Sequence, residues 1–87
     1  MNAMMIVKIN NGTYDEYKDF FDSLAERRAG FSSNGIIGKV DEHTAIVVSD
    51  LFDEAGWQAM AESPEVVQRA SELGVEREPF RLQPYEG

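Results

Sequence analysis

The chain has 87 residues, the size of a single small domain. Sixteen acidic residues against eight basic ones give a formal net charge of −8, which disfavours surfaces that bind phosphates of nucleic acids or anionic membranes. The absence of cysteine excludes disulfides, thiolate metal sites and a cysteine nucleophile. No stretch approaches the ~20 apolar residues that cross a bilayer. We therefore expect a cytoplasmic protein that binds neither nucleic acid nor membrane.

The N-terminus offers three methionines as possible starts, Met1, Met4 and Met5. The run around them is apolar over only a few positions and has no basic lead, unlike a secretory signal peptide. We expect residues 1–3 to be an added remnant and a single domain to span residues 4–87.

Four short segments have the composition of β-strands. Residues 4–9 and 44–49 are rich in β-branched and other apolar side chains on both alternating faces. Residues 35–40 contain two glycines, and residues 79–84 are bounded by prolines, which cannot donate a hydrogen bond to a neighbouring strand. We expect the first two segments to form the central pair of a sheet and the other two to be its edges. Residues 41–43 have the character of a hairpin turn.

The first helix begins at a capping box. Thr13 and Glu16 have the spacing at which each side chain bonds a free backbone N–H of the first helical turn. We expect the helix to end with Arg27 and Arg28 at the negative end of its dipole and with Gly30 as a left-handed stop. Its core-facing side chains at helical spacing are Tyr17, Phe20, Phe21 and Leu24.

A second helical region divides into two pieces. The first covers about residues 52–61 and begins near Asp50 or Asp53. The second has Ser63 as its N-cap, followed by proline, and Gly74 as its stop. The apolar face expected of this second piece comprises Val66, Val67, Ala70 and Leu73.

The element order β-α-β-β-α-β predicts an α+β fold of the ferredoxin-like type. Right-handed connections place both helical layers on one face of a four-stranded antiparallel sheet. In residues 44–49, Ile46 and Val48 point to one face, and Ala45 and Val47 point to the other. Since the helices cover only one face, the second face needs another cover, most simply the same sheet of a second copy. We expect a sheet-to-sheet homodimer with Ala45 and Val47 on the face between the copies.

Motifs along nearly the whole chain contribute to one resemblance. They are Ile6-Val7-Lys8, Tyr14 to Asp22 with Gly30, residues 41–49, Ser63-Pro64-Glu65-Val66, and Leu73 to Phe80. This pattern resembles the dimeric α/β-barrel superfamily, which includes antibiotic-biosynthesis-monooxygenase-like domains and uncharacterised small stress-responsive proteins. The resemblance implies a cofactor-independent monooxygenase or isomerase that holds a small apolar molecule between sheet and helices. Haem enzymes of similar fold place a ligand histidine on a helix, so we expect neither haem nor another cofactor.

Five residues are candidates for the site. His43 is the only histidine, and its hairpin position favours a turn residue, the alternative being a base at the mouth of the pocket. Tyr17 belongs to the core stripe, and its hydroxyl could orient a substrate. Trp57, the only tryptophan, is expected either to plug the core or, with Phe21 and Met60, to line a pocket.

Alternatives to an enzyme remain open. Seven carboxylates and no Lys or Arg lie between Lys39 and Arg69. The carboxylates are spread over a hairpin and two helix starts, so we expect an acidic surface and no metal site. The main alternative is a non-catalytic ligand-binding or interaction module whose interior its own side chains fill. A third is an amino-acid-sensing domain. A pocket above roughly 300 Å³ that His43 or Tyr17 reaches would favour the enzyme.

Overall fold

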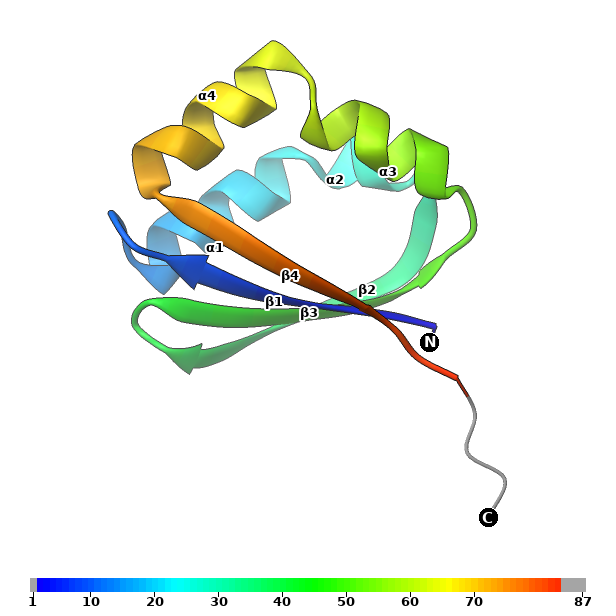
Figure 1. Ribbon diagram of the computed structural model, residues 1–87, viewed down its shortest axis with the longest axis horizontal. Helices are drawn as coiled ribbons and strands as arrows, with labels where there is room; N and C mark the ends of the chain where they lie inside the picture. Colours follow the sequence, from blue (N-terminus) through cyan, green and yellow to red (C-terminus); the bar gives the residue numbers. More distant parts are fainter. Residues whose placement is uncertain (1, 84–87) are drawn as a thin grey trace.

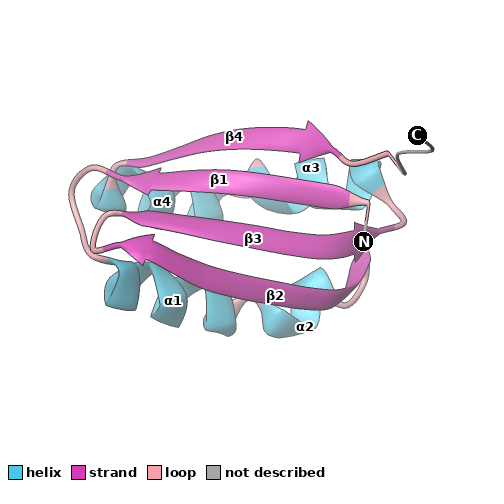
Figure 2. Ribbon diagram, turned by 90° about the horizontal axis from the view of Figure 1, so that it is seen from below, coloured by secondary structure: helices cyan, strands magenta, loops and turns pink. Residues whose placement is uncertain are grey.

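The computed structural model describes residues 2–83, which form a four-stranded antiparallel sheet with helices on one face (Figures 1 and 2). The strands are β1 (Ala3–Ile9), β2 (Ser32–Asp41), β3 (Thr44–Leu51) and β4 (Val75–Arg81). The helices are α1 (Tyr14–Ser23), α2 (Ala25–Arg28), α3 (Glu54–Ala61) and α4 (Pro64–Leu73). Strand order β2-β3-β1-β4 confirms the predicted α+β fold and its central pair. No helix of residues 2–83 has the length and apolar character needed to cross a membrane.

The core lies between the two central strands and helices α1 and α4. Val7 of β1 directly opposes Ala45 of β3, and both side chains are fully buried beneath the helices. Val47 lies on the same face of β3 and is also buried. The assignment of Ala45 and Val47 to the uncovered face is therefore wrong, because their pairing with β1 turns them toward the helices. The buried cluster comprises Val7, Ile9, Tyr17, Phe20, Phe21, Ala45, Val47, Val66, Ala70 and Leu73.

The opposite face of the sheet has no cover within residues 2–83 (Figure 2). It presents the alternate side chains of the same strands, as shown by the cross-strand pairs Ile6–Ile46 and Met4–Val48. Phe80 of β4, paired with Met4, continues this row and is 40% exposed. The uncovered face thus has an apolar row, beside which Lys8, Glu76 and Glu78 lie on the same face.

Local chemistry explains where α1 begins, but its end differs from the prediction. Thr13 Oγ1 accepts a hydrogen bond from the Glu16 N–H at 3.3 Å, and Glu16 Oε1 accepts one from the Thr13 N–H at 3.2 Å. The helix breaks at Leu24, after which α2 continues for one turn. Gly30 is not a left-handed stop; Gly74 is the only glycine of residues 2–83 with a positive φ, at 64°.

The second helical region follows the predicted division. Asp53 is the N-cap of α3, and its carboxylate accepts a hydrogen bond from the Gly56 N–H at 3.1 Å. Ser63 occupies the N-cap position of α4, although its hydroxyl donates back to the Met60 carbonyl instead of capping the helix. The prediction that Val67 belongs to the apolar face is wrong. Val67 is 50% exposed, because the helical rotation turns Val66, Ala70 and Leu73 toward the sheet.

Both terminal strands begin earlier than expected. Strand β4 starts at Val75, directly after α4, and not at Pro79, which lies within the strand opposite Met5. The sheet also includes Ala3 in β1, and Asn2 exchanges two hydrogen bonds with the Leu51 backbone. The predicted end of the last strand at residue 84 falls outside the described residues.

Candidate functional site

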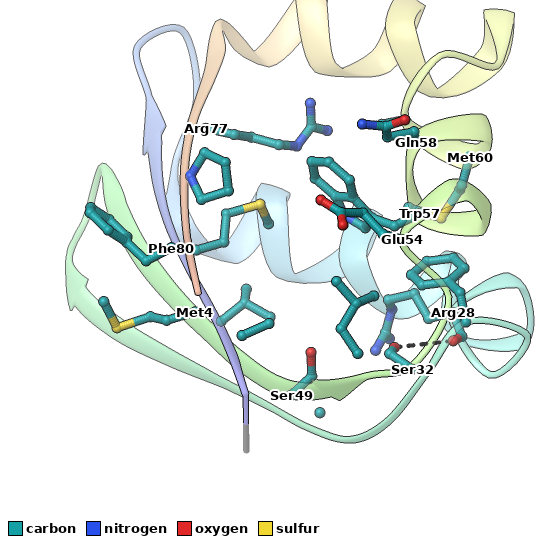
Figure 3. A pocket seen from close by; sticks show the side chains of 18 of the residues that line it. Met4, Arg28, Ser32, Ser49, Glu54, Trp57, Gln58, Met60, Arg77 and Phe80 are labelled. Atoms are coloured by element: carbon teal, nitrogen blue, oxygen red, sulfur yellow. Dashed lines mark hydrogen bonds between the residues drawn. The ribbon is translucent and has the colours of Figure 1, made fainter. Parts of the chain in front are cut away.

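A cavity of about 340 Å³ lies between the sheet and helices α1 to α3, at the end where β1 begins and β3 ends (Figure 3). Phe21 of α1 and Trp57 and Met60 of α3 form apolar walls, and the sheet contributes Met5 and Val47. The interior at this end is therefore open, whereas the large, fully buried side chains of Ile9, Val66 and Leu73 fill the other part of the core. The small lining residues at the open end are Ala3, Ser32, Gly35, Ser49 and Ala61.

Three of the five predicted site residues line this cavity, namely Phe21, Trp57 and Met60. Tyr17 lies behind the wall. It is 3% exposed, its ring centroid is 6.4 Å from that of Phe21, and it is not among the lining residues. The Tyr17 hydroxyl thus does not line the cavity, and it can affect a ligand only through the residues that do.

The structure does not bring His43 to the cavity. His43 lies exposed in the β2–β3 turn, where its Nδ1 is 2.7 Å from the carbonyl oxygen of Gly12 and its N–H donates to Asp41. This turn adjoins Ile9 at the end of β1, whereas the cavity adjoins Ala3 at its beginning. A seven-residue strand spans about 20 Å, so the two features lie at opposite ends of the sheet.

The polar residues of the cavity were not identified from the sequence. Three arginines line it, Arg28, Arg77 and Arg81, together with Glu54 and Gln58. Alternation along β4 could have indicated Arg77, because this residue lies on the same face of the strand as the apolar Val75. The alternation is visible only if the strand is taken to start at residue 75. The acidic residues at positions 76 and 78 hide this start, because they are not typical of a strand.

Arg77 reaches the cavity because of its register. It directly opposes the buried Val7 on β1, so its side chain leaves the sheet on the helix side. Figure 3 shows this side chain extending from β4 toward Gln58, beside the Trp57 ring. Burial raises the pKa of the Tyr17 phenol, and the charge and hydrogen bond of Arg77 partly oppose that rise. Tyr17 is thus a protonated phenol beside a guanidinium at the edge of the site.

Arg28 is packed against the aromatic wall. Its guanidinium carbon lies 3.6 Å from the centre of the Phe21 ring, and one terminal nitrogen donates to the Phe21 carbonyl at 3.0 Å. Burial lowers the pKa of Arg28, while the charge of Asp22 opposes that change. Its Nε atom is buried without a hydrogen-bond partner among residues 2–83.

Other classes of site have less support in the described part of the chain. Within residues 2–83, no three His, Asp or Glu side chains converge as a metal-binding group. The arrangement that remains is an apolar pocket with a few polar groups, the usual form of a small-molecule site.

Comparisons with known proteins address the fold. No protein-family model and no curated protein matches the chain. One similar solved structure is SnoaB from Streptomyces nogalater, a cofactor-independent oxygenase; it is 11% identical with a TM-score of 0.62, over 100% of this chain and 97% of that chain. The chain shares the ferredoxin-like fold of this structure.

Two further structures share this ferredoxin-like fold. A dimeric ferredoxin-like protein of unknown function from Thermobifida fusca is 18% identical, with a TM-score of 0.51 over 94% of this chain and 92% of its own. A proposed antibiotic biosynthesis monooxygenase from Deinococcus radiodurans is 8% identical, with a TM-score of 0.53 over 100% and 95%. The fold expected from the resemblance is therefore confirmed.

Proposed function

We propose that this protein binds a small apolar molecule in the cavity between sheet and helices and oxygenates or isomerises it without a cofactor. The observation that supports ligand binding best is the cavity itself. Neither His43 nor Tyr17 lines it, so the proposed turnover depends on the arginines of the lining instead. Its volume of about 340 Å³ lies within the range of roughly 300–1,000 Å³ that is common for ligand pockets, and aromatic and aliphatic side chains form its walls. The likeness to SnoaB, described as a cofactor-independent oxygenase, favours oxygenation over other chemistry.

The polar groups suit a substrate that becomes negatively charged on oxygen during the reaction. An activated CH₂ group loses a proton to solvent water, and the resulting enolate carbon bonds to dioxygen and is oxidised to a peroxide. The peroxide takes up a proton, and breakage of its O–O bond and of the remaining C–H bond releases water and leaves a carbonyl. The arginines of the lining, Arg28 and Arg77, would supply the positive charge that stabilises the enolate oxygen. Tyr17, kept protonated by burial, would orient Arg77. We give His43 no role in this step, because it contacts Gly12 at the opposite end of the sheet.

We also infer that the functional unit is a homodimer joined through the uncovered sheet face. Ile36 on β2 pairs with Val48, is 56% exposed and extends the apolar row of Ile6, Ile46 and Val48. The charged residues Lys8, Glu76 and Glu78 lie beside this row on the same face, and exposed apolar side chains gathered in this way mark interaction surfaces. The similar structure from Thermobifida fusca is described as dimeric, which supports a second copy of this chain as the partner that covers the face.

A matched pair of substitutions in α3 tests the proposed site. Ala61 lines the cavity, whereas Ala59 on the same helix is exposed and does not. Ala61→Phe should fill the space and abolish binding of naphthalene-sized compounds, measured by calorimetry, while Ala59→Phe should leave binding unchanged. Equal binding by both variants would contradict a site in this cavity.

Turnover is tested by oxygen uptake with protein freed of metals and flavin, using enolisable and phenolic aromatic compounds. We expect one O₂ to be taken up for each substrate molecule oxidised. The Ala61→Phe variant should show no oxygen uptake. Binding in the cavity without any turnover would instead support the non-catalytic ligand-binding module.

A further inference from the structure

The cavity contains more positive than negative charge. Among the acidic and basic residues that line it, Glu54 is the only carboxylate, and it forms an ion pair with Arg81 at 2.8 Å. None of the ion pairs found within residues 2–83 involves Arg28 or Arg77. This excess is local, since the whole chain has a formal charge of −8.

Arg28 has unused hydrogen-bonding capacity. Its guanidinium stacks on Phe21 and makes one hydrogen bond to a backbone carbonyl, and its buried Nε has no partner among the described residues. Asp22, the acid that acts on Arg28, has its carboxylate bonded to Lys18 at 2.6 Å. A partly buried cation without a close counterion is costly, so an anion from outside would be favoured there.

Arg77 offers a more accessible group. A guanidinium has five N–H donors. The Tyr17 hydroxyl is a hydrogen-bond partner of the Arg77 guanidinium and occupies one of them. The adjacent acids Glu76 and Glu78 alternate onto the uncovered face of β4, opposite Lys8 and Ile6, and so point away from the cavity. The side chain of Arg77 is directed past Trp57 toward Gln58, which is uncharged (Figure 3).

We propose that the ligand of this cavity is an aromatic or aliphatic carboxylate, whose charged group binds Arg77 and whose apolar body contacts Phe21 and Trp57. This inference rests on the proposed function and specifies the ligand class of the same site. A carboxylate accepts two parallel hydrogen bonds from a guanidinium, which fixes both the position and the orientation of the ligand. Arg28 contributes a second positive charge at the Phe21 wall.

The test compares two ligands of the same shape, 2-naphthoate and the uncharged 2-naphthamide. Affinity is measured by calorimetry, and the site is located by the NMR signal of the indole N–H of Trp57, the only tryptophan. A charged hydrogen bond contributes about 1.5–3 kcal/mol, so we expect naphthoate to bind at least about tenfold more tightly. Long-range repulsion by a chain of charge −8 acts in the opposite direction, so such a preference must come from local groups.

Two arginine variants assign the preference to a residue. Arg77→Gln should abolish the preference for naphthoate while naphthamide still binds. Arg69→Gln removes the same charge from an exposed position on α4, where Arg69 pairs with Glu72, and should leave the preference intact. An unchanged preference in Arg77→Gln would overturn the assignment to Arg77.

The comparison on the unmodified protein decides the matter even if Arg77→Gln does not fold. Equal affinity for naphthoate and naphthamide, with both shifting the Trp57 signal, would overturn the carboxylate inference and leave the proposed apolar site standing. No shift of that signal by either compound would overturn both.

Discussion

Arg81, the last residue of β4, donates a hydrogen bond to the carboxylate of Glu54, the first residue of α3, across 2.8 Å. Both residues line the cavity, so this ion pair joins the sheet to a helix beside the site. Their side chains are 55% and 57% exposed, and a pair so accessible to water contributes at most about 1 kcal/mol to folding. Its larger effect is on the charge of the cavity, because Glu54 neutralises one of three arginines.

Replacing Glu54 by glutamine should therefore change ligand binding more than stability. We expect Glu54→Gln to raise the affinity for 2-naphthoate severalfold, because it removes the one negative charge of the lining, and to leave 2-naphthamide unaffected. The free energy of unfolding should change by less than about 1 kcal/mol. Calorimetry and urea unfolding measure the two quantities. Glu72→Gln, which removes an acid paired with Arg69 on α4, is the control; weaker binding of naphthoate by Glu54→Gln would contradict the charge argument.

Tyr17 should make stability depend on alkaline pH. Burial raises the pKa of its phenol, so the folded protein holds this proton more tightly than the unfolded chain does. The contribution of the protonated phenol is complete below the unfolded pKa of about 10 and is lost as the pH rises from there through the folded pKa. We expect the stability difference between the unmodified protein and Tyr17→Phe to shrink between pH 9 and pH 11, measured by urea unfolding. A difference that is constant over this range would show that Tyr17 is not shielded from water.

The uncovered sheet face should control assembly. Ile46→Lys places a charge in the middle of this face, opposite Ile6, and should convert a dimer to a monomer at micromolar concentration. Val67→Lys makes a similar change on the exposed side of α4 and should leave the dimer intact. Sedimentation velocity distinguishes the two states. If the unmodified chain is already a monomer at this concentration, the inferred interface is wrong.

Gly74 should be the glycine least tolerant of a side chain. It has φ of 64°, and a Cβ atom there would lie 2.8 Å from the backbone nitrogen of Asn11. Positive φ alone costs a non-glycine residue about 1–2 kcal/mol, so Gly74→Ala should lose at least about 2 kcal/mol in urea unfolding. Gly38→Ala is the matched control, because nothing lies within 4 Å of its added methyl group. A loss of equal size in both variants would mean that the turn after α4 does not need glycine.

Interactions between residues close together in the chain could be predicted from the sequence. The capping box of Thr13 and Glu16 involves groups three residues apart, and the start of α3 at Asp53 depends on a similar local hydrogen bond. The central position of β1 and β3 followed from their apolar composition, which suits strands buried by neighbours on both sides. These features need no knowledge of the rest of the fold.

Tertiary structure alone decided which face each side chain occupies and where the site lies. Ala45 is buried because it opposes Val7, and Arg77 enters the cavity because it opposes Val7 from the other side; both facts depend on register between strands distant in sequence. His43 is remote from the cavity because antiparallel pairing puts its turn beside the end of β1. A shift of one residue in register exchanges the two faces of a strand, and periodicity within a single strand cannot distinguish them. Alternation could therefore predict two apolar faces, but only the pairing of the strands determines which one the helices cover.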